Sequence, residues 1–372
     1  MALANFFAMS SFGSFFLFPL FISERGGSKA DIGIMMGAFA LSSVLCRPYI
    51  SQMVDRIGRK RSYSIGCLIM ACLPLVYLWF QGELSGFYLP LLLVRLVHGV
   101  GLAICFTAAF TYIVDVIPPS RLNEGIGMFG VTGLLALGVG PLIAEIIVRD
   151  FGFNMFFVSA SVLGAAGLVL HQPLPESYLK SDGTDVPSFF SVLFQRRTFV
   201  VASLSLLFGF GLAASGGFVA PFAKENHLTF VSLYYLSYSS AAIVTRVFGG
   251  KFADRVGEER ILPYALTLTA LGLWLLIVLW GDSTLLVSGL LSGCGHGFLF
   301  PCLNALVIRD QPIHIRGKVT GVFTGSIDTG AFAGSILLGY IGESAGYGAL
   351  FFVAGLSLLA GLAIYPRQPT RT

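Results

Sequence analysis

The chain has 372 residues, of which 55% are hydrophobic and only 11% are charged, and its mean hydropathy is +0.83. Soluble domains carry about 25% charged residues. So few charged groups cannot cover a water-exposed surface, and the composition therefore excludes an ordinary soluble protein and predicts lipid as the surroundings. The net charge of +4 reflects basic residues gathered in a few connecting segments, and we expect no nucleic-acid partner.

Apolar segments long enough to span a bilayer, about 20 residues each, recur along the whole chain. They lie near residues 2–23, 30–53, 63–80, 87–114, 124–148, 152–171, 198–221, 229–252, 261–280, 284–307, 319–341 and 345–365. Long apolar runs are typical of helices, whereas strands alternate with period two. The predicted fold class is therefore an all-α membrane protein with twelve transmembrane helices.

The basic residues predict which ends of these helices face the cytoplasm. If the N-terminus is inside, most Lys and Arg outside the spans fall in inner segments and only a few fall in outer loops. Cytoplasmic loops are enriched in Lys and Arg, so both termini are predicted to be cytoplasmic. We expect a multi-pass protein of a bacterial inner membrane.

Signals for bound metals or catalysis are weak. The six cysteines lie in predicted spans without metal-ligand spacing, and no phosphate-binding GxxxxGK[ST] loop occurs. We therefore expect no metal, no cofactor and no enzymatic activity, and small apolar packing is the simplest role for the cysteines.

A charged segment appears twice. VDRIGRKR at residues 54–61 returns as ADRVGEER at residues 253–260, 199 positions later. Arg47 and Arg246 keep the same offset, and His98-Gly99 is echoed by His296-Gly297. The sequence thus predicts two equivalent six-span halves, residues 1–172 and 198–372, joined by a cytoplasmic linker at 173–197. Parallel repeats of this kind place the substrate between the halves near the bilayer midplane.

The charged segment resembles the loop motif of the major facilitator superfamily (MFS). The first copy matches it at Asp55, Arg56, Gly58 and Arg59, and the second at Asp254, Arg255 and Gly257. The resemblance implies two pseudo-symmetric six-helix bundles, a small-molecule substrate and function as a monomer. A fifth-span motif associated with exporters is matched in part by Gly138, Gly140 and Pro141, which favours an efflux-type drug or sugar:proton antiporter. Pro141 is expected to bend that span.

The resemblance also predicts a cytoplasmic gate around Asp55. A carboxylate at the C-terminal end of its own helix needs a positive partner. Arg56, Arg59 or the start of span 11 are candidates, and Asp115 would complete a charge cluster. By symmetry Asp254 would face the start of span 5. Anchoring of basic residues at the membrane surface is the plainer alternative.

Ionisable residues at membrane depth are costly and usually functional. Helical rise places Asp328 near the midplane and Arg47 about one turn away on an expected neighbouring span. We predict an Arg47–Asp328 ion pair that opens during transport, with Asp328 as the candidate proton carrier. A purely structural pair is the alternative.

Four further buried groups are candidates for the substrate or proton pathway. Arg95 and Glu145 lie at depths that allow a pair, or Arg95 binds an anionic substrate group. His98 and His296 either carry protons or make structural hydrogen bonds. Arg246 is a further ionisable residue at membrane depth. It lies close to the inner end of its span, so its side chain could instead reach back to the membrane surface.

The sequence therefore predicts proton-coupled export of a small organic molecule, driven by the proton gradient. An uptake symporter or uniporter for a sugar or organic anion is the alternative within transport. A non-transporting membrane receptor or scaffold on the same fold is the alternative from another class.

Overall fold

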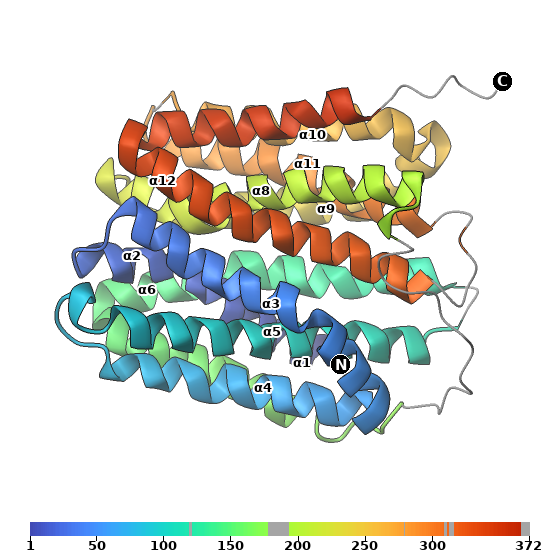
Figure 1. The fold of residues 1–372 in the computed structure, drawn as a ribbon, viewed down its shortest axis with the longest axis horizontal. Helices are drawn as coiled ribbons and strands as arrows, with labels where there is room; N and C mark the ends of the chain where they lie inside the picture. The colour runs from blue at the N-terminus through green and yellow to red at the C-terminus, as the bar shows by residue number, and fades with distance from the viewer. Residues whose placement is uncertain (119–120, 178–192, 279, 309–310, 312–315, 366–372) are drawn as a thin grey trace.

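The structure, a computed structural model, describes residues 1–118, 121–177, 193–278, 280–308, 311 and 316–365. These parts of the chain form a bundle of long helices, drawn side by side in Figure 1. The side chains of residues 122–124, 250–251, 253–254 and 316–318 lie outside the description. The predicted all-helical fold class is confirmed for the described residues.

Among its described residues, the N-terminal part of the chain contains six α-helices and three short 3-10 turns. They are α1 (Ala2–Ser14), η1 (Phe15–Leu17), α2 (Phe18–Glu24), α3 (Lys29–Ile57), α4 (Arg59–Val76), η2 (Tyr77–Trp79), η3 (Leu84–Gly86), α5 (Tyr88–Val116) and α6 (Leu122–Leu170). The C-terminal part contains α8 (Arg196–Glu225), α9 (Ser232–Val256), α10 (Glu258–Leu275), α11 (Asp282–Ile308) and α12 (Arg316–Ile364).

Local sequence signals explain where several of these helices begin and end. Ser28 and Asp31 form a reciprocal capping box at the start of α3, each side chain accepting from the other residue's backbone N–H. Gly58, with φ of 101°, separates α3 from α4, and Gly257, with φ of 90°, separates α9 from α10. Positive φ is easy only for glycine, which is why glycine recurs in both charged segments.

Two of the long helices each contain one break. Gly152 in α6 has φ of 76° and Gly346 in α12 has φ of 82°, so each helix consists of two helical segments. The predicted spans 124–148 and 152–171 meet at the first break, and spans 319–341 and 345–365 meet at the second. The predicted first span is likewise continuous through α1, η1 and α2.

Eight helical stretches of the described chain are long and apolar enough to cross a membrane, with α6 and α12 each counted once. Helices α9 and α10 coincide with predicted spans but are not among the eight. The chain is thus an integral multi-pass membrane protein by the length and composition of its helices.

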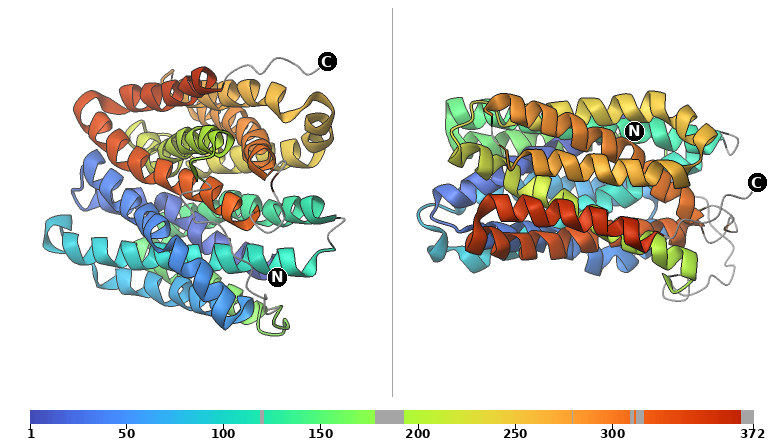
Figure 2. Two further views of the ribbon diagram at one scale, coloured as in Figure 1. Left: turned by 45° about the vertical axis from the view of Figure 1, so that its right-hand side comes forward. Right: turned by 90° about the horizontal axis from the view of Figure 1, so that it is seen from above.

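Among the described residues, helices pack mainly within their own half of the sequence, and two pairs form the most extensive contacts across the halves. In the first half α1 packs on α6, and α5 packs on α3 and α4; in the second half α8 packs on α12, and α11 packs on α9 and α10. Across the halves α3 packs on α12, and α6 packs on α9. In Figures 1 and 2 helices α3 and α12 diverge toward the end that carries the charged loops. We call this end the motif face, and the end with Arg25 and Lys29 the opposite face.

Candidate functional site

An ion pair joins α3 to α12 between the two halves. The guanidinium of Arg47 donates from Nη2 to Oδ2 of Asp328. Arg47 also donates from Nη1 to Thr324 Oγ1 at 2.9 Å, and Ser43 Oγ donates to Asp328 Oδ2 at 2.8 Å. The predicted Arg47–Asp328 pair is confirmed, and Thr324 and Ser43 are hydrogen-bonding partners that the sequence did not reveal.

The surroundings of this pair allow it to change. The Arg47 and Asp328 side chains are 17% and 28% exposed, so neither is sealed within the packed helices. A Cβ added at Gly325 would meet only the Arg47 side chain, at 3.6 Å. The pair is therefore partly accessible and is not locked into a close-packed core.

Arg95 is held differently from the prediction. Its side chain is buried, and its guanidinium carbon lies 4.6 Å from the Phe39 ring centroid and 4.7 Å from that of Phe18. Its Nε donates to the Met35 carbonyl at 3.3 Å. Among the described residues no carboxylate pairs with Arg95, and its Nη1 is buried without a hydrogen bond.

Glu145 caps another helix instead of pairing with Arg95, so the predicted Arg95–Glu145 pair is wrong. Its two carboxylate oxygens accept from the backbone N–H groups of Val231 and Ser232, both at 2.7 Å. Those groups form the N-terminal end of α9, where a negative charge is stabilised by unpaired N–H groups and the helix dipole. Similar depth in the membrane suggested Arg95 as the partner of Glu145. The actual partners are backbone N–H groups, which the spacing of charged residues cannot reveal.

Further contacts close the opposite face between the halves. Lys29 Nζ lies 3.4 Å from Glu225 Oε2, and its backbone N–H donates to Glu343 at 2.9 Å. Lys224 forms an ion pair with Glu24. Together with Glu145, these groups tie the first half to the second at this end.

The two buried histidines each meet a tyrosine. His98 Nδ1 lies 3.2 Å from the Tyr77 hydroxyl, and His296 Nδ1 hydrogen-bonds to the Tyr238 hydroxyl. This agrees with the structural hydrogen bonds considered for both residues. Nε2 of His98 is buried without a partner among the described atoms. These contacts do not test proton transfer, so that role stays a prediction.

The charged loop forms a cluster within the first half. Arg59 Nε donates to Asp115 Oδ2 at 2.8 Å, and Arg59 Nη1 lies 3.3 Å from Asp55 Oδ1. The expected cluster of Asp55, Arg59 and Asp115 is confirmed, whereas Arg56 is exposed and forms no ion pair with the described residues. The side chains at the start of α12 are outside the description, so the latch between Asp55 and that helix stays a prediction.

The linker covers this loop. Glu176 Oε1 accepts from the backbone N–H groups of Arg59 at 2.8 Å and Lys60 at 3.2 Å, which caps α4. A Cβ at Gly58 would come close to the Glu176 carboxylate, so a larger residue there would displace this side chain. Most of the predicted linker, residues 178–192, lies outside the described residues.

The second copy of the motif is described only in part. Gly257 repeats the positive φ of Gly58, and Arg255 is exposed. The Asp254 side chain is outside the described residues, so its predicted place at the start of span 5 stays a prediction.

The glycines of the exporter-like motif lie at close helix contacts. A Cβ at Gly138 would lie 2.9 Å from Ser239 of α9, and one at Gly140 would lie 2.6 Å from the Ser10 carbonyl of α1. Pro141 lies inside α6, where the one residue with non-helical dihedrals is Gly152, so Pro141 does not break the helix. The bend expected at Pro141 stays a prediction.

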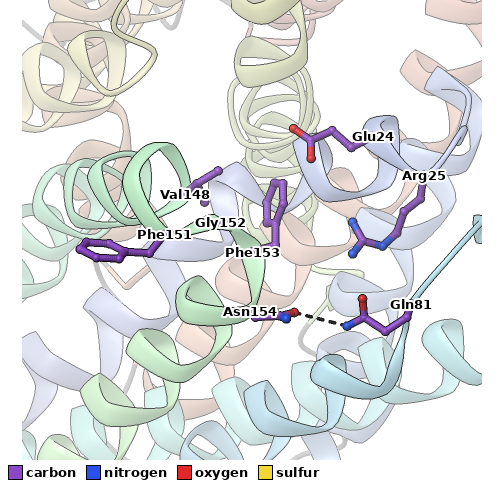
Figure 3. A pocket seen from close by; sticks show the side chains of 8 residues that line it. All are labelled: Glu24, Arg25, Gln81, Val148, Phe151, Gly152, Phe153 and Asn154. Carbon is purple, nitrogen blue, oxygen red and sulfur yellow. Dashed lines mark hydrogen bonds between the residues drawn. The ribbon is translucent and has the colours of Figure 1, made fainter.

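Two surface cavities do not coincide with the predicted substrate pathway. One, of about 330 Å³, lies at the opposite face within the first half, beside the Gly152 break (Figure 3). There Gln81 donates to Asn154 at 3.3 Å, and burial lowers the pKa of Arg25. The other, of about 600 Å³, lies beside Gly58, Lys60 and Glu176 at the motif face. Neither is lined by residues of both halves.

Comparison with known proteins decides the family. The model of the Major Facilitator Superfamily matches residues 1–236 and 201–372, which together cover the chain. The chain belongs to the Major Facilitator Superfamily. An uncharacterised MFS-type transporter of Methanocaldococcus jannaschii is 25% identical over 94% of this chain and 92% of its own length. The staphylopine export protein of Staphylococcus aureus is 20% identical over 95% and 91%.

The fold of this MFS protein is also that of solved transporters. A POT family transporter solved in complex with 5-aminolevulinic acid superposes with a TM-score of 0.80, at 12% identity, over 98% of this chain and 94% of the other. Relatives and fold are those of transporters that act within a membrane. The site between α3 and α12 thus lies in a protein that shares its family with MFS-type transporters.

Proposed function

We propose that this MFS protein is a proton-coupled antiporter that exports a small organic molecule by alternating access. It acts as a monomer without a bound cofactor in a bacterial inner membrane, with the motif face and both termini in the cytoplasm. Its twelve spans form two six-helix bundles, residues 1–172 and 198–372, joined by the linker at 173–197. The excess of basic residues at the motif face supports this orientation.

The observation that carries the proposal is the Arg47–Asp328 pair between the halves. A charged carboxylate holds the Arg47 guanidinium and keeps α3 close to α12. Protonation of Asp328 removes one charge and leaves Arg47 to other partners. A single proton therefore alters an interaction on which the arrangement of the halves depends, which is what coupling requires.

Contacts at the opposite face support an alternating-access cycle. Glu145 and the lysine pairs hold that face closed, while α3 and α12 diverge toward the motif face. With the opposite face closed, the proposed exporter takes up its cargo from the cytoplasmic side. The relative named as an exporter supports the direction.

The test is transport by purified protein in proteoliposomes. A panel of amphipathic cations, zwitterions and anions is screened for flux, with and without an imposed pH gradient. The proposal predicts flux that the gradient accelerates and that Asp328→Asn uncouples from it. Flux that is indifferent to the gradient contradicts proton coupling, and absence of flux across the panel favours a non-transporting scaffold.

A further inference from the structure

Arg246 of α9 is the repeat counterpart of Arg47, but the partners of Arg47 are missing around it. The two arginines are 199 residues apart, as are Ser43 and Ala242. Gly152 and Gly346 break α6 and α12 at equivalent points 194 residues apart. Gly140 and Gly334, with the same spacing, each pack closely on the first helix of their own half. This spacing aligns α6 with α12 residue by residue.

The alignment shows what replaces each partner. Thr324 and Asp328, which bind Arg47, correspond to Gly130 and Leu134 of α6. The structure agrees with the alignment, since a Cβ at Gly130 would lie 2.8 Å from Nη1 of Arg246. The second site therefore keeps the cation and has lost the threonine, the serine and the carboxylate.

Among the side chains that the structure describes, none supplies Arg246 with an anion. Its Nε is buried and has no hydrogen bond, and no ion pair with it occurs among the residues that the structure describes. Its guanidinium carbon lies 5.4 Å from the Phe300 ring centroid, and Phe300 in turn contacts Phe323. The side chain thus lies between α6, α9 and α11.

A guanidinium in this position calls for an anion from outside the chain. Burying an unpaired charge is costly, and Arg246 lies at the α6–α9 contact between the two halves, where parallel-repeat transporters bind cargo. The residue is only partly buried, so it is accessible to a ligand. The aromatic ring of Phe300 beside it suits an apolar group next to the charge.

We propose that Arg246 is a binding residue for the anionic group of the cargo, which is an amphipathic organic anion or zwitterion with an apolar or aromatic part. The inference rests on the proposed transport function and names the chemical class of its substrate. Arg47 of the first repeat pairs with Asp328 of the same chain. Arg246 of the second repeat is proposed to pair with the anionic group of the cargo.

The test uses purified full-length protein in nanodiscs and two matched pairs of probes. Indole-3-acetate is compared with indole-3-acetamide, and benzoate with benzamide, by the shift each causes in melting temperature. In the wild type each carboxylate should bind about tenfold or more tightly than its amide, because only the anion pairs with the partly buried Arg246 guanidinium. Arg246→Gln should abolish this preference.

A second variant keeps the test valid if Arg246→Gln fails to fold. Leu134→Asp places a carboxylate at the position equivalent to Asp328, where it should pair with Arg246 and exclude the probe. Leu134→Asn, which is similar in size to Leu134→Asp but uncharged, is the matched control. Its preference for carboxylates over amides should stay closer to that of the wild type than the preference of Leu134→Asp does.

The outcomes separate this inference from the proposed function. Equal response to acid and amide in the wild type, or a carboxylate preference that survives both Arg246→Gln and Leu134→Asp, overturns the role of Arg246. Transport of neutral or cationic probes in proteoliposomes would then still support the proposed function. Selective binding of the anions without any flux would retain Arg246 as a binding residue and contradict transport.

Discussion

Arg47 of α3 and Asp328 of α12 come from different repeats and form an ion pair at the contact between them. Ser43 Oγ accepts from Arg47 and donates to Asp328, and Thr324 accepts from Arg47, so the pair is one part of a four-residue network. Its equivalent in the other repeat contact lacks all three partners of the arginine. The two cross-repeat contacts thus share a geometry and differ in charge.

The cap that Glu145 forms on α9 should hold the opposite face closed. Glu145→Gln removes a charge that accepts two backbone N–H bonds, which is expected to weaken the closed state by about 1–2 kcal/mol. Spin labels are attached at Glu83→Cys and His227→Cys, one in each half, in a background without the native cysteines. The distance between the two labels should show a larger population of long distances in Glu145→Gln, as expected for opening of this face.

Lys224→Gln is the control for this change, since it breaks an exposed cross-repeat pair with Glu24. Exposed ion pairs contribute little, so this variant should shift the distances less than Glu145→Gln does. Unchanged distances in Glu145→Gln would show that its cap does not contribute to closure.

His171 should make the protein less stable in mild acid. Burial lowers the pKa of His171, and the positive charge of Lys60 lowers it further. Nδ1 donates to the Gly167 carbonyl, so Nε2 faces the Ser64 hydroxyl as an acceptor, which suits neutral imidazole. Because the folded pKa lies below the unfolded value of about 6.5, the unfolded state binds more protons as pH falls through this range, and stability decreases.

Melting temperatures at pH 7.5 and 5.5 test this effect. The wild type should lose a few degrees at the lower pH, and His171→Gln should lose less. The matched control is His227→Gln at an exposed position, which should behave like the wild type. An equal loss in His171→Gln and wild type would count against His171.

The break in α12 should depend on glycine for conformational reasons alone. Gly346 has φ of 82° and ψ of 173°, and the space that a methyl group would occupy there is open, so Gly346→Ala is expected to destabilise by about 1–3 kcal/mol through backbone strain. Gly348→Ala, two residues later in regular helix with its nearest neighbour at 3.9 Å, should be neutral or stabilising. Thermal unfolding of the two variants checks this, and equal melting temperatures would contradict it.

Much of this organisation could be predicted from the sequence because lipid imposes strong constraints. Long apolar runs marked the helices, and the 199-residue repeat led to Gly58 and Gly257. The Arg47–Asp328 pair was predictable because both ends are charged and few carboxylates lie at that depth. The Arg59–Asp115 contact followed from the position of both residues at one face.

The remainder of the site depended on partners that leave no charged signature. Glu145 binds backbone N–H groups, Arg95 lies among phenylalanine rings, and Glu176 of the linker caps α4. The missing partners of Arg246 became evident only from the helix breaks at Gly152 and Gly346. These breaks give α6 and α12 an offset of 194 residues, which differs from the 199 residues of the charged segments. Aligning the repeats on Gly152 and Gly346 would have found it.

The most direct test of the account is a charge exchange at the central pair, measured as pH-gradient-driven flux of a transported probe in proteoliposomes. Arg47→Asp and Asp328→Arg should each reduce the initial rate by about tenfold or more, because each leaves two like charges facing one another. The double variant with the charges exchanged should recover much of that rate. A double variant no faster than either single variant would contradict the claim that this ion pair couples the two halves.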